Sequence, residues 1–177
     1  MKQYAHILNG ASLAGLASFS MLLGFYYIFS WNPLGPIKLL AFVVPIVLYV
    51  FFLQKYRDET LEGIMPFKLA VTPGILFAFV YASLTTMLMY LLMTFLDDGI
   101  LELNKLESLK QFGQTKEMMI EWLGKAKYEE SIVEIENMGA ATFASSDFFS
   151  KFSTSVIVNL IIAGILRKNP NSDTIDG

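Results

Sequence analysis

The chain has 177 residues, of which 54% are hydrophobic and only 16% are charged, with a net charge of −3. Soluble domains carry about 25% charged residues, and one this small has too little interior to hide so much apolar surface, so the composition predicts a membrane protein. The acidic balance argues against nucleic acid as a partner, and the absence of cysteine with only one histidine argues against disulfides, thiolate chemistry and zinc sites.

Two apolar segments lie in the N-terminal third, and each approaches the roughly 20 residues that a membrane-spanning helix needs. We expect the first span at residues 7–31, where it carries no charge and is followed by the helix breakers Pro33, Gly35 and Pro36. The second span is expected at residues 37–53. It is short, and Lys38 stands at its margin, where a long side chain can reach the headgroups.

Two further apolar segments complete the pattern. The third, at residues 69–96, is uncharged and longer than the membrane core requires, so it either tilts or begins at Pro73 with Thr72 as its cap. The fourth is expected at residues 148–166, capped by Ser145 or Ser146. Asp147 then lies in or beside the first turn and can pair with Lys151 four residues later.

Each of these segments must be helical, because backbone polar groups find no water in lipid and must be satisfied within the segment. Continuous apolar runs also differ from the alternating pattern of a membrane β-barrel. The predicted fold class is therefore all-α. We expect a single transmembrane domain over residues 1–177, an integral membrane bundle of four transmembrane helices with a helical extracytoplasmic loop.

That long loop, residues 97–147, contains two stretches with helical spacing of apolar residues. The first runs from Leu103 to Phe112 and is ended by Gly113, and the second runs from Met118 to Ala126. Two short amphipathic helices of this kind either lie on the membrane surface or cap the transmembrane domain, and we favour the cap. The acidic stretch 129–137 is expected to be solvated.

Basic residues predict the orientation of the bundle. They gather in the N-terminus, the second loop and the C-terminal tail, which share one side of a four-span protein: Lys2, Lys55, Arg57, Lys68, Arg167 and Lys168. The positive-inside rule then places both termini in the cytoplasm and the loop 97–147 outside. The five lysines within that loop weaken this inference.

A search for catalytic groups finds little. A serine–histidine–acid triad would need His6, and the acidic pair Asp97–Asp98 is best explained as a charged membrane boundary. No phosphate-binding or dinucleotide motif is present. We therefore expect no enzymatic activity, no cofactor and no metal.

Polar residues inside the predicted spans are the best candidates for a functional role. Asn159 and Ser155 lie near the middle of the fourth span, and Thr85 and Thr86 lie within the third. Such groups either line a polar path or join helices through hydrogen bonds, and the second role is the commoner one. No charged residue is expected near a midplane, which argues against an active transporter.

Small residues recur at overlapping four-residue spacings in the first span, at Gly10, Ala11, Ala14, Gly15 and Ser18. Small side chains let two helix backbones approach closely. This face is either a seam for a second protein chain or a packing surface inside the monomer, and the sequence does not separate the two.

Three stretches resemble a known family. They are Lys55–Asp58 with Gly63–Lys68 after the second span, Phe95–Asp98 at the end of the third, and Leu160–Pro170 at the end of the chain. In layout the chain is similar to the domain of unknown function 4199 family, small four-span membrane proteins found mainly in Bacteroidota. The resemblance implies a bacterial inner (cytoplasmic) membrane, and it implies no activity or catalytic residue.

Two hypotheses follow for the function. The first is a non-enzymatic accessory protein that binds the lipid bilayer and another membrane protein or a second copy of itself. The second is a small oligomeric channel or facilitator for a small solute, whose path uses Asn159 and the serine and threonine sets. Neither hypothesis involves nucleic acid.

Overall fold

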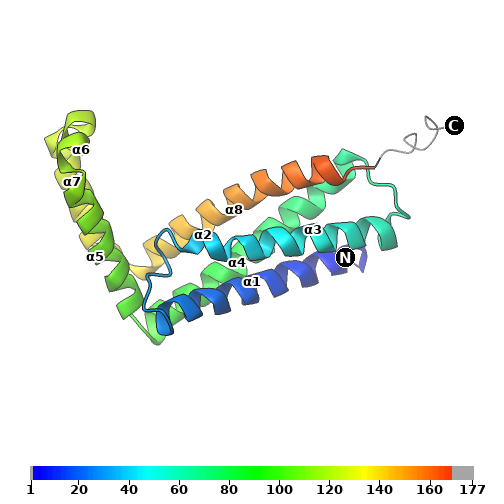
Figure 1. Ribbon diagram of the computed structural model, residues 1–177, viewed down its shortest axis with the longest axis horizontal. Helices are drawn as coiled ribbons and strands as arrows, with labels where there is room; N and C mark the ends of the chain where they lie inside the picture. Colours follow the sequence, from blue (N-terminus) through cyan, green and yellow to red (C-terminus); the bar gives the residue numbers. More distant parts are fainter. Residues whose placement is uncertain (1, 169–177) are drawn as a thin grey trace.

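The computed structural model describes residues 2–168, which form a bundle of long helices with a helical arm at one end (Figure 1). Four helical segments are long and apolar enough to cross a membrane, namely Ala5–Tyr27, Lys38–Thr60, Phe67–Phe95 and Ala140–Leu166. No strand occurs among the described residues apart from one isolated bridge, between Met65 and Lys168. The predicted fold class, an all-α bundle of four spans, is confirmed.

The first span is helix α1 (Ala5–Tyr27), preceded by a short 3₁₀ turn, Lys2–Tyr4. It ends four residues earlier than predicted, because the chain turns at Ser30, whose φ is +55°. The predicted helix breakers Pro33 and Pro36 lie in the connection that follows.

The second span consists of two helices, α2 (Lys38–Ala41) and α3 (Val43–Thr60), which meet at Phe42. Pro45 explains the break, since it has no N–H to donate to the carbonyl of Ala41 four residues earlier. Ser18 of α1 supplies the missing donor, and its Oγ lies 3.2 Å from that carbonyl oxygen. The span also continues seven residues beyond the predicted end at residue 53.

The third span is helix α4 (Phe67–Phe95). It starts before Pro73, so Thr72 does not cap it, and at 29 residues it is long enough to cross the membrane at a tilt. The fourth span is α8 (Ala140–Leu166), which begins eight residues earlier than predicted. Ser145 is therefore inside the helix, where its hydroxyl bonds to the carbonyl of Ala141 at 2.9 Å, and it is not a cap.

Helix α4 lies at the centre of the bundle, where it packs most extensively against α8 and then against α1. Buried side chains gather in two clusters, one toward each end of the bundle. Tyr49, Phe77 and Tyr81 belong to the cluster nearer the N-terminus, and Leu22, Met89 and Ile100 to the one nearer the arm.

The arm contains three helices rather than the two predicted, α5 (Gly99–Gln114), α6 (Lys116–Leu123) and α7 (Lys125–Glu136). Gly113 does not end the first one. The chain turns instead at Thr115 and at Gly124, whose φ of +82° suits glycine. The stretch 129–137, expected to be merely solvated, is mostly helical because it belongs largely to α7.

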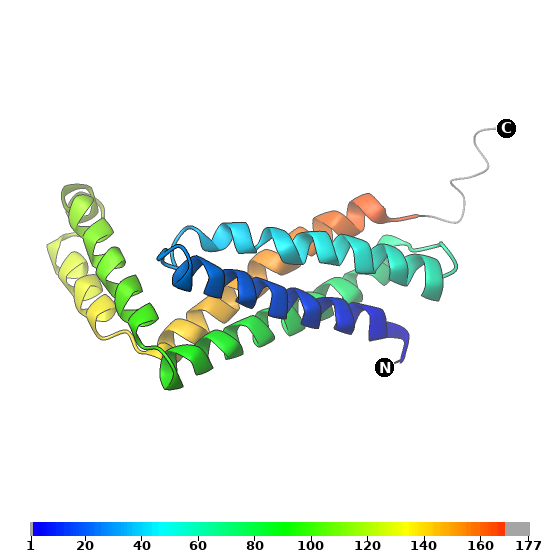
Figure 2. The ribbon, with the colours of Figure 1, turned by 60° about the horizontal axis from the view of Figure 1, so that its bottom comes forward.

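The arm stands across the end of the bundle and extends beyond it (Figures 1 and 2). Its helices pack mainly against one another, and its base is joined to the α1–α2 connection by hydrogen bonds from Asn32 to Asn104 and Glu107, at 3.2 and 2.8 Å. The arm thus lies at the end of the transmembrane domain, as expected of a cap, but contacts it mainly through its base.

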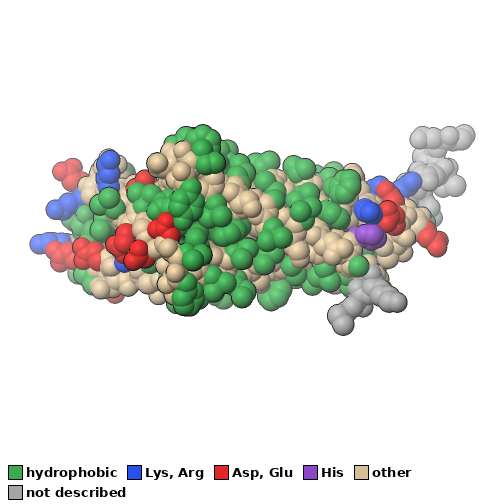
Figure 3. Space-filling view, turned by 90° about the horizontal axis from the view of Figure 1, so that it is seen from below, with side chains coloured by type: hydrophobic (Ala, Val, Ile, Leu, Met, Phe, Trp, Pro, Cys, Tyr) green, Lys and Arg blue, Asp and Glu red, His purple; other side chains and the backbone are tan. Residues whose placement is uncertain are grey.

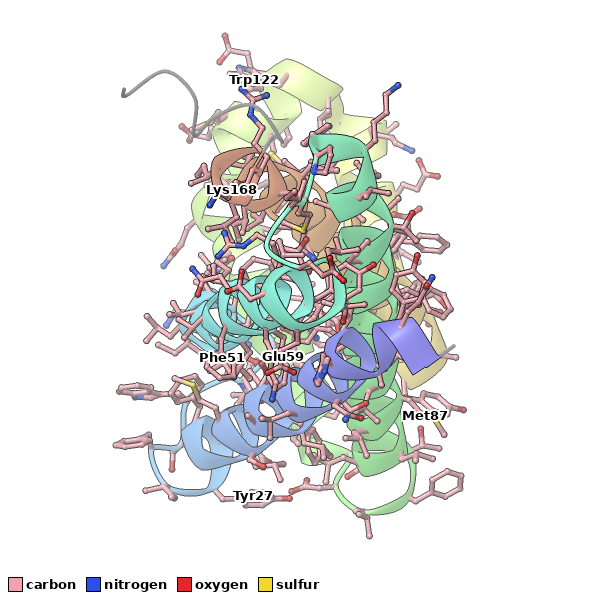
Figure 4. The ribbon with its side chains drawn as sticks, turned by 90° about the vertical axis from the view of Figure 1, so that its right-hand side faces the viewer. Tyr27, Phe51, Glu59, Met87, Trp122 and Lys168 are labelled. Atoms are coloured by element: carbon pink, nitrogen blue, oxygen red, sulfur yellow. The ribbon has the colours of Figure 1, made fainter. Side chains whose placement is uncertain are left out.

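The surface of the bundle has the character that a lipid environment requires. Hydrophobic side chains cover the middle of the face shown in Figure 3, and charged groups gather at its two ends. In the view along the bundle, Phe51 and Met87 point outward on opposite sides (Figure 4), and both are more than half exposed. Such side chains in a continuous band are stable in contact with lipid tails.

Candidate functional site

A row of polar side chains runs along the buried face of α8, where the helix meets α4. Four residues at successive four-residue intervals, Asp147, Lys151, Ser155 and Asn159, lie on one side of the helix because about 3.6 residues make a turn. Together with Thr86 of α4 they form what we call the polar seam. Asp147, Ser155 and Asn159 are each at most 5% exposed.

An ion pair lies at the end of the seam nearer the arm. The ammonium of Lys151 donates to Oδ2 of Asp147, and the hydroxyl of Thr86 donates to the same oxygen at 3.1 Å. The side chains are 12% exposed for Lys151 and 2% for Asp147. The predicted pairing of these two residues is confirmed, but its predicted position in a first turn at the membrane boundary is wrong.

The pair lies well inside helix α8, and the expectation that no charge lies near the membrane midplane stays a prediction. Helix α8 has 27 residues, and Lys151 is the twelfth of them, about 3 Å along the axis from the helix midpoint. From Asp147 to Asn159 the seam covers about 18 Å, which is more than half of a hydrocarbon core about 30 Å thick. Ionisable groups inside membrane-spanning segments are rare and mark functional sites in many membrane proteins.

The other end of the seam contains an amide and two hydroxyls. The amide of Asn159 donates to the carbonyl oxygen of Gly74 in α4 at 2.9 Å. A Cβ on Gly74 would lie 2.9 Å from the hydroxyl of Tyr49 and 3.3 Å from Cβ of Asn159, so the glycine lets α3, α4 and α8 meet closely. The hydroxyls of Tyr49 and Ser155 are buried and have no hydrogen-bond partner in the described part of the chain.

Unpartnered hydroxyls in a membrane interior are costly, by roughly 1–3 kcal/mol each in proteins. Water or a polar solute in the seam would satisfy them. The hydroxyls of Tyr49 and Ser155 are therefore the two groups of the seam that such a molecule would satisfy.

A cavity of about 70 Å³ adjoins the ion pair. It lies where α1, α2, α4 and α8 come together. Its polar lining includes both partners of the pair and five other side chains: Ser18, Lys38, Tyr81, Ser150 and Thr154. A cavity of this size accommodates water or a small solute.

The predicted polar-path residues are only partly brought together. Asn159, Ser155 and Thr86 belong to the seam, whereas Thr85 faces α1, with its hydroxyl 2.9 Å from the carbonyl oxygen of Tyr81 and 3.4 Å from that of Gly15. Sequence reasoning missed the role of Lys151. The four-residue repeat from Asp147 to Asn159 is the signal that could have revealed it.

The small residues of α1 pack inside the monomer. A Cβ on Gly10 would lie 2.5 Å from the ring of Phe52 in α3, and one on Gly15 would lie 3.0 Å from Leu84 in α4. Ala14 is fully buried, and Ser18 bonds to Ala41 as described above. This face is occupied by α3 and α4 and is not available as a seam for a second chain.

The other candidates for chemistry lie apart at opposite ends of the bundle. Oδ2 of Asp97 accepts a hydrogen bond from Tyr27 at 2.8 Å, and Oδ1 accepts one from the backbone of Gly99 at 3.0 Å, so Asp97 holds the start of the arm. His6 pairs with Glu59 at 3.1 Å, at the end remote from the arm. Residues 2–168 contain no group of three or more side chains that could hold a metal ion.

Comparison with known proteins places the chain in a family. No curated protein and no solved structure shows significant similarity to it. The sequence profile of the family described as "Protein of unknown function (DUF4199)" matches residues 9–168, which is nearly the whole chain and includes all four spans except the first turn of α1. The chain belongs to this family of proteins of unknown function.

Proposed function

We propose that this protein lets a small polar or charged solute cross the membrane through the polar seam between α4 and α8. The observation that carries this proposal is the buried Asp147–Lys151 pair, which continues through Ser155 to Asn159 along the buried face of α8. A pair of charges is expensive in lipid, and it adds no stability that apolar residues could not supply. A role in recognising a polar solute accounts for its presence.

The proposal includes three properties of the protein. It acts without covalent catalysis, with His6 paired to Glu59 and Asp97 engaged at the start of the arm. It resides in a bacterial inner membrane. Both termini face the cytoplasm, in keeping with the basic residues Lys55, Arg57 and Arg167 at the end of the bundle where α1 begins and α8 ends.

Flux into proteoliposomes tests the proposed path. Stopped-flow light scattering would follow the entry of urea, glycerol, sodium chloride and sodium nitrate. We expect at least one probe to enter faster than into empty liposomes, and Asn159→Leu and Lys151→Met to remove most of that gain. Ile157→Val, on a side chain that is 61% exposed to lipid, is the matched control and should leave entry unchanged. Entry no faster than in empty liposomes would refute the proposal.

The orientation is tested by labelling introduced cysteines. Because the chain has no cysteine of its own, only the introduced residue can react. Ser131→Cys on α7 should react with a membrane-impermeant maleimide added to intact spheroplasts, whereas Thr60→Cys at the end of α3 should react only after lysis. The reverse pattern would place the termini outside.

The arm favours a second function, that of an accessory subunit which binds a partner protein. Its exposed apolar side chains include Trp122, at 78%, and Leu106, at 66%, and Trp122 lies on the arm beyond the bundle (Figure 4). The arm also has eight glutamates and five lysines over residues 99–137, which favours a basic partner over an anionic lipid surface.

Gentle extraction followed by mass analysis tests this second function. A partner present in a fixed ratio with the wild type and lost with Trp122→Ala would support the accessory role. A protein that emerges alone or only as its own oligomer would count against it.

A further inference from the structure

The cavity beside the ion pair contains more positive charge than negative. Lys38 of α2 and Lys151 of α8 both line it, and Asp147 is the one carboxylate in its lining. Asp147 is already engaged by Lys151 and Thr86, while Lys38 has no ion pair among residues 2–168. The cavity therefore has one excess positive charge, at the level of the bundle where Lys38 begins the second span.

An excess charge in a medium of low dielectric constant calls for a counter-ion, because its interaction with water is weakened there and its attraction to an opposite charge is strengthened. The hydroxyls of Ser150 and Thr154 line the same cavity and are further hydrogen-bond donors. Ammonium and hydroxyl donors arranged around a small space are the groups that bind an anion.

The volume limits the ligand to a compact one. The cavity measures about 70 Å³, and one water molecule takes about 30 Å³ in the liquid. A halide, a nitrate or a single phosphate group is of suitable size, whereas a nucleotide or a peptide is not. The lining includes Leu39, which is 68% exposed toward the lipid, so a phosphate group could belong to a lipid that reaches in from the side.

We infer that the cavity between α2 and α8 is a binding site for a small anionic group, held by Lys38 and Lys151. The inference rests on the proposed function in taking this site to be the one at which the solute is recognised. The anionic group is either a free monovalent anion or the phosphate of an anionic lipid.

The test measures how anions raise the thermal unfolding temperature of the full chain, because a ligand that binds the folded state stabilises it. The protein is placed in nanodiscs of neutral phosphatidylcholine, and chloride or nitrate replaces gluconate at constant ionic strength. We expect saturable stabilisation. Lys38→Gln should weaken the apparent affinity at least about tenfold, and Lys55→Gln, at the opposite end of the bundle, is the matched control.

The variant Asp147→Asn shows whether the cavity binds an anion or a cation. Removing the carboxylate raises the excess positive charge, so anion affinity should increase and the unfolding temperature should depend more steeply on chloride. A site for a cation predicts the opposite, with binding abolished by Asp147→Asn and improved by Lys38→Gln, and that result would overturn the inference. If Asp147→Asn does not fold, Lys38→Gln alone decides, since Lys38 is only partly buried.

A second set of measurements distinguishes the two sources of the anion. In chloride-free nanodiscs containing phosphatidylglycerol, stabilisation of the wild type but not of Lys38→Gln would identify a lipid phosphate. Stabilisation by chloride or nitrate alone would identify a free anion. No dependence on any of these anions would overturn the inference. Anion binding without solute flux would refute the proposed function but support the anion site. Solute flux without anion binding would support the proposed function but refute the anion site.

Discussion

The buried ion pair makes a quantitative prediction about stability. Replacing Lys151 by methionine leaves the carboxylate of Asp147 unpaired at a site where its side chain is only 2% exposed. Breaking a buried pair from one side costs about 3–5 kcal/mol, and a lone charge near the centre of a membrane helix costs about 2.5–3.5 kcal/mol on insertion scales. We therefore expect Lys151→Met to lower the free energy of unfolding by about 3 kcal/mol.

The double substitution is the control for this reasoning. Asp147→Leu with Lys151→Met removes both charges while keeping similar volumes. It should restore stability to that of the wild type or raise it by about 1–4 kcal/mol, because the cost of burying two charges is gone. The difference between the single and double variants then measures the coupling between the two side chains.

Unfolding in mixed detergent micelles, with increasing sodium dodecyl sulfate, measures these free energies. A cost below about 1 kcal/mol for Lys151→Met would refute the reasoning, since a pair so cheaply broken behaves like a solvent-exposed one. A double variant less stable than either single one would also contradict it.

Two further predictions concern helix packing. Gly10→Ala places a Cβ 2.5 Å from the phenyl ring of α3 and should cost about 1–3 kcal/mol by the same unfolding assay, whereas Gly24→Ala, with nothing within 4 Å, should cost nothing. Ser18→Ala removes the donor to the Ala41 carbonyl and should cost about 1 kcal/mol, but in a Pro45→Ala background, which restores a backbone N–H, the cost should disappear. Equal costs in both backgrounds would show that the proline is not the reason for the serine.

The number of spans and the fold class were predictable because lipid imposes a simple rule on the sequence. A backbone in lipid must satisfy its own hydrogen bonds, so long apolar runs such as residues 69–96 indicate helices. The ends of those helices were less predictable. Residues 140–147 are mostly small and include three polar side chains at their end, so they do not read as part of an apolar run, but Phe143 among them packs into the buried cluster nearer the arm.

The site was only partly predictable for a related reason. Asn159 and Ser155 stand out within an apolar run, and their positions in the middle of a span follow from the sequence. Asp147 and Lys151 lie where the hydropathy pattern indicates a membrane boundary, and their burial depends on the contact with Thr86 in another helix. A pattern along one helix does not show which residues of a distant segment cover it.

The small residues of α1 show the same limit. Spacing predicts that another helix approaches Gly10 and Gly15 closely, and it does. Whether that helix belongs to the same chain depends on how all four spans are arranged. Only the structure shows that Phe52 of α3 and Leu84 of α4 occupy this face.

Access of water to the seam is the most direct test of the central claim that the buried face of α8 is a solute path. Ser155→Cys in the seam and Ile157→Cys on the lipid face are compared in proteoliposomes, against a chain that has no cysteine of its own. A small, charged methanethiosulfonate reagent needs water to reach its target. A solute path predicts that the cysteine at position 155 reacts at least about tenfold faster than the one at 157. Equal and negligible rates at both positions would contradict it and would leave the seam as a structural contact between α4 and α8.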